Sequence, residues 1–383
     1  MITIEQYKLL CDPDVRQAIA EKISRDPLHI ALDKRISHAA EVATQVKYLD
    51  RARKKLPSYF EARCIIPSLA FEQSSSEECA AHKPLTGGSV LDLTCGLGVD
   101  AFYLSQRFER VVTIERNEVL AEVARENFRR LGATNIEVIC ADSAEYVATC
   151  TDHFDWCYAD PDRRGEKGEK LVRLEDCSPD MVALMPRLQS IAEKVCIKAS
   201  PMFDVDEAFR LFDDCSVEVC SLGDECKEVL IYIDREHQGA ITATALGIGG
   251  YSEQRGANNE PALPEFRGEE YRWLVQPDVA LQKCRLARRH LAGKADIWSE
   301  NGYGFAIEQP EGVVGRIYEI DRIEPFDPKS LKREMKGKKV QILKRDFPLA
   351  TERLMAMTGL KEGGSTRVAF TTVEGKFLVI RLK

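Results

Sequence analysis

The chain has 383 residues, which is enough for two or three domains with hydrophobic cores. Its composition is 44% hydrophobic, 30% charged and 8% aromatic, which excludes disordered and fibrous proteins. The net charge of −8 hides an asymmetry, because residues 271–383 carry 22 Lys and Arg against 14 Asp and Glu. A basic C-terminal region therefore follows an acidic body, and an anionic polymer is a candidate partner.

Neither a membrane span nor a signal peptide is expected, because no run approaches about 18 apolar residues and the first residues lack a basic-then-apolar pattern. The 13 cysteines are scattered without a Cys-x-x-Cys pair, which predicts reduced thiols in a cytoplasmic protein. The six histidines show no clustered spacing, so no metal site is expected.

The first residues, up to about 62, repeat apolar side chains at helical spacing, as in Val15, Ile19 and Ile23. We therefore predict a helical region over 1–85. Short apolar strands then alternate with amphipathic helices. This alternation predicts a parallel sheet with helices on both faces, in a domain over 86–245. The expected strands are Val90–Leu93, Val111–Ile114, Ile136–Ile139, Phe154–Ala159 and Val195–Lys198, with Ser216–Leu222 and Val229–Ile233 as an antiparallel pair at the edge.

The segment 246–270 is expected to be a linker, since residues 252–267 are rich in Gly, Asn, Pro and Glu. An α+β pattern follows and is divided into two small regions, 271–320 and 321–383. The expected helices are Val279–Leu291, Pro328–Met335 and Leu349–Met357, and the expected strands are Tyr303–Ile307, Val313–Ile323, Val340–Leu343, Thr366–Thr372 and Lys376–Arg381.

The most informative stretch is Ser89–Ser105, in which a hydrophobic strand ends at Asp92, a glycine turn follows, and a helix opens near Val99. The glycines of Gly96-Leu-Gly98 allow a tight turn and a close approach to a ligand, and the helix amino terminus presents amide donors. The motif alone also fits the loose dinucleotide pattern, so a nicotinamide-dependent enzyme is an alternative.

Polar residues follow the next three strands, where ligands bind in open α/β sheets. Glu115 ends the second strand and is placed to accept hydrogen bonds from a ribose. Asp142-Ser143 follows the third strand, where a carboxylate could reach an adenine amine. The fourth strand leads into Asp160-Pro-Asp-Arg163. A nicotinamide-dependent enzyme would leave this last cluster unexplained, and no catalytic Tyr-x-x-x-Lys is evident.

With these four motifs in order, about 150 residues of the chain resemble the class I S-adenosylmethionine-dependent methyltransferases. The resemblance implies an α/β, Rossmann-like fold with S-adenosylmethionine as the cofactor. The residues implied at the cofactor are Asp92, Thr94, Cys95, Gly96, Gly98, Asp100, Glu115, Arg116, Asp142, Ser143 and Asp160. The residues implied at the substrate, with catalytic roles, are Asp160, Pro161, Asp162 and Arg163.

Four segments extend the resemblance to a bacterial family of uncharacterised methyltransferases with a ferredoxin-like insert and a C-terminal THUMP-like domain. These segments are Phe71–Glu77, Asp160–Arg164, Leu274–Ala280 and Lys344–Phe347. The family implies a ferredoxin-like subdomain at 271–320 and a THUMP-like domain at 321–383. It also implies that Gln73, Ser75 and Ser76 cap the cofactor pocket; a polar loop before the first strand is the alternative. THUMP domains occur on tRNA-modifying enzymes.

The sequence after Asp160-Pro161 departs from the pattern of base-amine methyltransferases, which continue with a second proline and an aromatic residue. Asp162 and Arg163 stand in those places. Arg163 could stack on a base or bind a phosphate, it could pair with neighbouring acids, or the substrate is not a base amine. Asp162 could be a general base or an ordinary surface carboxylate.

Residues 329–345 hold eight cations against the single acid Glu334, a pattern that suits contacts with nucleic-acid phosphates. The cations expected to contact RNA are Lys329, Lys332, Arg333, Lys336, Lys338, Lys339, Lys344 and Arg345. The leading hypothesis is an S-adenosylmethionine-dependent methyltransferase of tRNA or rRNA that acts on a base nitrogen. The alternatives are a methyltransferase of a protein or small molecule, and a non-catalytic RNA-binding protein with a vestigial cofactor fold.

Overall fold

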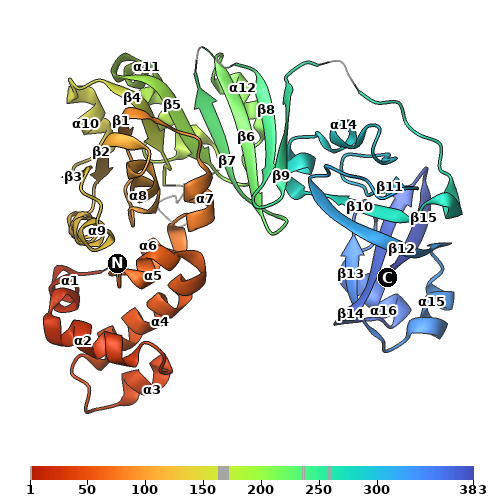
Figure 1. Ribbon diagram of the computed structural model, residues 1–383, viewed down its shortest axis with the longest axis horizontal. Helices are drawn as coiled ribbons and strands as arrows, with labels where there is room; N and C mark the ends of the chain where they lie inside the picture. The colour runs from red at the N-terminus through yellow and green to blue at the C-terminus, as the bar shows by residue number, and fades with distance from the viewer. Residues whose placement is uncertain (1, 163–171, 235, 237, 258–259) are drawn as a thin grey trace. The chain divides into compact units, whose positions relative to one another are not determined.

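The computed structural model describes residues 2–162, 172–234, 236, 238–257 and 260–383 (Figure 1). The chain forms two compact units, the first of residues 1–216 and 229–238 and the second of residues 217–228 and 239–383. The boundary runs through strands β6 (Cys215–Leu222) and β7 (Glu225–Ile233). Among the described residues, no helix has both the length and the apolar character that a bilayer span requires.

Unit 1 begins with short helices, as the apolar spacing predicts (Figure 1). They are α1 (Ile4–Cys11), α2 (Pro13–Lys22), α3 (Pro27–Leu32), α4 (Ala39–Lys55), α5 (Pro57–Glu61), α6 (Ser68–Gln73) and α7 (Glu77–His82). Asp12 and Asp26 cap α2 and α3 with their carboxylates, and each is followed by a proline at the first helical position, where its missing N–H costs nothing.

These helices are packed onto the sheet domain of the same unit. Apolar residues of α1 to α6 share one hydrophobic core with Leu97, Val99 and Val123 of the sheet domain. The buried Asn127 amide fixes the contact, because it accepts a hydrogen bond from the Ile65 amide at 2.8 Å and donates one to the Ile65 carbonyl at 2.9 Å. The N-terminal helices are therefore an integral layer of unit 1.

The sheet of unit 1 has the strand order β3-β2-β1-β4-β5-β7, in which only β7 runs antiparallel to its neighbour. Its remaining strands are β1 (Gly87–Asp92), β2 (Phe108–Glu115), β3 (Ile136–Cys140), β4 (Phe154–Ala159) and β5 (Ala192–Ala199). The accompanying helices are α8 (Val99–Ser105), α9 (Glu118–Leu131), α10 (Ser143–Thr149), η1 (Leu174–Asp176), α11 (Met181–Ile191) and α12 (Val205–Leu211). The predicted Rossmann-like α/β fold is confirmed. Because β1 pairs with both β2 and β4, the carboxyl ends of three strands meet at one edge.

In unit 2, β6 pairs in parallel with β8 (Ala240–Ala245), which pairs antiparallel with β9 (Gly249–Gln254). Strand β9 lies inside the segment that the sequence indicated as a linker. The sequence of β9 begins with two glycines and continues with polar residues, so it lacks the apolar pattern of a strand. Its pairing with β8 holds it in the sheet. A short 3-10 helix, η2 (Gly268–Glu270), ends that segment.

A six-stranded sheet with the order β11-β10-β12-β15-β14-β13 forms the rest of unit 2. Its strands are β10 (Trp273–Pro277), β11 (Gly304–Ala306), β12 (Gly315–Pro325), β13 (Lys339–Lys344), β14 (Lys361–Val373) and β15 (Lys376–Leu382). Its helices are α13 (Val279–Lys283), α14 (Ala287–Leu291), α15 (Pro328–Met335) and α16 (Thr351–Thr358).

Two features of this sheet differ from the sequence-based expectation. The prediction of a single helix over 279–291 is wrong. The segment forms two helices, α13 and α14, because Arg285 between them has a left-handed φ of 56° that cannot continue a helix. The division expected between residues 320 and 321 falls within β12, which pairs with β10 through its first half and with β15 through its second half. One strand thus belongs to both of the regions that the sequence separated.

Candidate active site at the carboxyl ends of the strands

Asp92 ends β1 and is 1% exposed. Its carboxylate accepts a hydrogen bond from the Thr113 hydroxyl at 2.6 Å and another from the Thr94 amide at 3.0 Å. Burial raises the pKa of Asp92 to about 7, against the opposing effect of these hydrogen bonds. Asp92 therefore fixes the start of the glycine loop through its hydrogen bond with the Thr94 amide.

This raised pKa predicts a pH dependence of stability. Because the pKa of about 7 in the folded chain exceeds the ordinary value of 3.8, the folded state retains a proton that the unfolded chain has released between those values. The free energy of unfolding of the wild type, minus that of Asp92→Asn, should fall as the pH rises from about 4 to about 7, by on the order of 4 kcal/mol. Urea unfolding across this range measures it, and a flat difference would contradict it.

The glycine loop lies against the end of β2. The Gly96 amide donates a hydrogen bond to Glu115 at 2.9 Å, and the second oxygen of Glu115 accepts one from the Asn117 amide at 2.8 Å. Burial raises the pKa of this carboxyl group. Gly98 has a φ of 84°, and a Cβ there would lie 2.5 Å from the Phe128 ring, so only glycine is accommodated.

The Glu115 carboxylate and the glycine loop fit the nucleoside part of S-adenosylmethionine. Each oxygen of Glu115 accepts one hydrogen bond, and a carboxylate oxygen has a second acceptor position for a ribose hydroxyl. A Cβ placed on Gly96 would meet no atom within 4 Å, so the loop leaves open space at that point. Gly96, Gly98 and Glu115 would hold the cofactor through the backbone of the loop and the ribose.

The other predicted cofactor residues flank this loop. Asp142 is exposed and caps α10 through the amides of Ala144 and Glu145, and the Ser143 hydroxyl donates to the Leu93 carbonyl at 2.6 Å. Cys95 is buried and its amide pairs with the Ile114 carbonyl. Burial raises the pKa of its thiol well above the ordinary value, so it packs under the loop as a neutral group.

A buried polar cluster joins β5, the end of β4 and helix α8 to the segment before β1. The Lys198 ammonium, on β5, donates to Asp160 at 2.6 Å and to the Ser75 hydroxyl at 2.8 Å. Ser75 in turn donates to Asp100 at 2.8 Å, and Asp100 also pairs with Lys83 at 2.7 Å. The Lys83 and Lys198 side chains are 1% and 6% exposed, so these ion pairs are shielded from water.

The charges of this cluster control its acids. Burial acts to raise the pKa of Asp100, but the ammonium groups of Lys83 and Lys198 outweigh it and hold that pKa below its ordinary value. Asp100 is therefore ionised at neutral pH. Asp160 and Asp100, two acids that the sequence singled out, are thus bridged by Lys198 and Ser75.

The sequence left two possibilities open for Lys198, which could face the site at the end of the fifth strand or be solvated, and it assigned no role to Lys83. A charged residue near the carboxyl end of the otherwise apolar run Val195–Ile197 needs a partner, which is the signal for the first possibility. Lys83 carries no such signal. Of the predicted cap, Ser75 lies in the cluster and Ser76 caps α7 by accepting from the Cys79 amide, whereas Gln73 is exposed at the end of α6.

The segment after β4 connects directly to the loop after β1, because the Asp160 amide donates to the Thr94 hydroxyl at 2.7 Å. Pro161 is buried, and Asp162 pairs through its backbone with Ser178 in both directions. Arg116 reaches the Ser178 hydroxyl at 3.3 Å and the Asp162 carboxylate at 3.6 Å. Arg163 lies outside the described residues.

The predicted RNA contacts lie in unit 2 on α15, β13 and the loops around them. All except Arg345 are exposed: Lys329, Lys332, Arg333, Lys336, Lys338, Lys339 and Lys344. Arg345 has a side chain only 12% exposed; it donates to the Pro277 carbonyl at 2.6 Å and pairs with Asp224 at 3.3 Å. Arg345 therefore holds the domain together, and the exposed cations form the basic surface.

Comparisons with known proteins agree with this architecture. Residues 90–161 match the model of a methyltransferase domain, and residues 315–383 match that of a THUMP domain-like family. A solved structure of a proposed methyltransferase from Porphyromonas gingivalis W83 is 26% identical with a TM-score of 0.84, and the match covers 100% of this chain and 99% of that one.

Two relatives match over shorter lengths. The ribosomal RNA small subunit methyltransferase J of Coxiella burnetii is 33% identical over 127 residues, 29% of this chain and 49% of the relative. An uncharacterized S-adenosylmethionine-dependent methyltransferase of Mycobacterium tuberculosis is 27% identical over 223 residues, 58% of this chain and 59% of the relative. The chain thus spans about half the length of the ribosomal RNA methyltransferase that it matches.

These matches confirm the predicted resemblance to methyltransferases with a THUMP-like C-terminal region, and they favour this class over nicotinamide-dependent enzymes. The chain carries a region that matches a methyltransferase domain, followed by a region that matches a THUMP-like domain.

Proposed function

We propose that the chain is an S-adenosylmethionine-dependent methyltransferase that acts on RNA, with transfer to a base nitrogen. The observation that carries the proposal is the hydrogen bond of 2.7 Å between the Asp160 amide and the Thr94 hydroxyl. It ties the residue expected to hold the methyl acceptor to the loop expected to hold the methyl donor. Transfer to a nucleophile requires such proximity, with the reacting atoms about 3–3.5 Å apart.

S-adenosylmethionine supplies an electrophilic methyl group, and the chain supplies position and charge. Lys198 contacts Oδ2 of Asp160, whereas Oδ1 has no hydrogen-bond donor among the described residues. Oδ1 can therefore accept an N–H from an acceptor amine and orient its lone pair toward the methyl group. As the bond from the acceptor nitrogen to the methyl carbon forms, the bond from that carbon to the sulfonium sulfur would break and S-adenosylhomocysteine would leave. The Asp160 carboxylate would stabilise the positive charge that the nitrogen gains before it loses a proton to water.

The RNA substrate is supported by three observations. The relative from Coxiella burnetii is named for methylation of ribosomal RNA. The C-terminal residues match a THUMP domain-like model. The basic surface of α15 and β13 includes Lys332 and Arg333, which are exposed and have no ion pair among the described residues, so they can contact phosphates.

The RNA-binding role of this surface predicts a change in salt dependence. In the double variant Lys332→Gln/Arg333→Gln, the slope of log affinity against log salt for RNA should decrease in magnitude by about 1.4, which corresponds to two lost phosphate contacts. The matched control is Arg272→Gln/Lys376→Gln, which removes two other exposed cations of unit 2. Fluorescence anisotropy with labelled RNA measures both. Equal slopes for the two double variants would remove this surface from RNA binding.

A further inference from the structure

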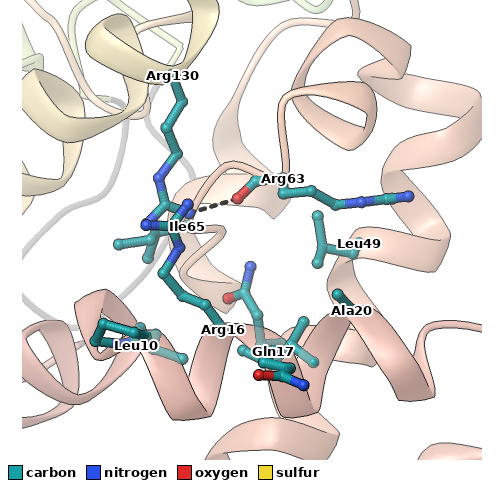
Figure 2. Close-up of a pocket in the computed structure, with 11 residues that line it drawn as sticks. Leu10, Arg16, Gln17, Ala20, Leu49, Arg63, Ile65 and Arg130 are labelled. Carbon is teal, nitrogen blue, oxygen red and sulfur yellow. Dashed lines mark hydrogen bonds between the residues drawn. The ribbon is translucent and has the colours of Figure 1, made fainter.

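A cavity of about 340 Å³ lies within unit 1, at the N-terminal helices and away from the strand ends described above (Figure 2). Its walls include Leu10, Ile19 and Leu49, and three arginines line it: Arg16 of α2, Arg63, and Arg130 of α9. The volume is in the range of sites that bind small molecules. No carboxylate is among the residues that line it.

The guanidinium of Arg130 is buried, with a side chain only 5% exposed. Its Nε donates to Glu126 at 2.7 Å and its Nη1 donates to the Arg63 carbonyl (Figure 2). Its Nη2 is buried and has no hydrogen-bond partner among the described residues. An unpaired buried donor on a charged group is costly, so this nitrogen is suited to an acceptor from outside the chain.

Arg16 supplies a second cation to the same cavity. In Figure 2 its side chain rises from α2 toward the region that Arg130 enters from α9. Arg16 has no ion pair among the described residues. The buried amide of Gln45, also in the lining, is already bonded to the Cys64 carbonyl and the Ile66 amide. Arg130 is paired with Glu126, which does not line the cavity, whereas Arg16 and Arg63 have no ion pair among the described residues. The cavity therefore carries positive charge that no carboxylate in its lining balances.

We propose that this cavity is a phosphate-binding site. Guanidinium groups bind phosphate oxygens through paired hydrogen bonds, and both the phosphate of a free nucleotide and the phosphodiester of RNA are anions that they attract. The apolar walls of Leu10, Ile19 and Leu49 suit the sugar or base attached to that phosphate. The phosphate belongs either to a free nucleotide or to an RNA backbone, and both offer the same chemistry to the arginines. The site does not depend on the methyltransferase activity.

Isothermal titration calorimetry of the full chain tests the site at low ionic strength, with saturating S-adenosylhomocysteine to block the cofactor loop. The probes are inorganic phosphate, uridine monophosphate and a ten-nucleotide RNA without a terminal phosphate. We expect at least one probe to bind, and the Arg16→Gln variant to bind it about tenfold more weakly, which is the effect of losing one charged hydrogen bond. The matched control is Arg129→Gln, an exposed neighbour of Arg130 that also pairs with Glu126.

The probes separate the two sources of phosphate. Arg16-dependent binding of inorganic phosphate or uridine monophosphate, but not of the RNA, would assign the cavity to a free nucleotide. Arg16-dependent binding of the RNA would assign it to the backbone of a nucleic acid. The proposal is overturned if no probe binds, or if Arg16→Gln and Arg129→Gln have the same affinities. Because the readout is binding and not methyl transfer, failure of this site leaves the proposed function untouched.

Discussion

The Asp160→Asn variant will transfer methyl groups about 100- to 1,000-fold more slowly than the wild type, because the amide keeps the shape of the side chain and removes its charge. The carboxylate is expected to stabilise the positive charge that develops on the attacking nitrogen. The measurement is the initial rate of incorporation of labelled methyl groups into RNA from a strain that lacks the gene. The affinity for S-adenosylmethionine should change little, since Asp160 contacts the glycine loop through its backbone amide.

The matched control is Asp152→Asn. Asp152 precedes β4, whereas Asp160 follows it, so the two acids lie at opposite ends of one strand. Asp152 has a side chain that is 44% exposed and pairs with Arg110 at 2.8 Å, and its loss should leave the rate unchanged. A wild-type rate in Asp160→Asn would show that its carboxylate takes no part in the transfer. A joint loss of rate and cofactor affinity would point to a collapsed loop and not to a role in chemistry.

The second large effect is on stability. Replacement of Lys198 with methionine removes a buried cation from beside Asp160 and Asp100 and leaves two acids with less compensation. Breaking a buried ion pair from one side costs about 3–5 kcal/mol in the free energy of unfolding. The control is Lys194→Met on the same strand, whose side chain is 27% exposed and whose pair with Asp234 should contribute at most about 1 kcal/mol. Urea unfolding measures both variants.

A double-variant cycle shows whether Lys198 acts through Asp160. In Lys198→Met/Asp160→Asn both members of the pair are uncharged, so the combined loss of stability should be smaller than the sum of the two single losses. Additive losses would mean that the two side chains do not interact across the 2.6 Å contact. A loss in Lys198→Met no larger than in Lys194→Met would show that the cluster is accessible to water.

Much of unit 1 is predictable from local sequence because its elements follow local rules. The helix at Glu118–Leu131 has an amphipathic face, a capping asparagine before it and a glycine after it, so its bounds are specified locally. The motif residues Asp92, Glu115 and Asp160 each lie where an apolar strand ends. Parallel strands bring these ends to one edge, so the residues meet once the fold is known.

The features that the sequence concealed depend on contacts between distant segments. The cluster around Lys198 joins residues separated by as many as 123 positions, and nothing in the neighbourhood of Lys83 distinguishes it from a surface lysine. The cavity at Arg16 and Arg130 likewise needs segments that are far apart in the sequence, since its lining comes from residues 10–65 and from Arg130 of α9. Strand β9 is also set by tertiary pairing, which overrides local propensity.

The most direct test of the proposed function uses purified protein, methyl-labelled S-adenosylmethionine and an extract of a strain that lacks the gene. The extract is divided into untreated, RNase-treated and protease-treated portions, with Asp160→Asn as the control. We expect label in the untreated and protease-treated portions, none after RNase treatment, and labelling about 100- to 1,000-fold slower with the variant. Label that survives RNase treatment would contradict an RNA substrate and assign the methyl acceptor to a protein or a small molecule.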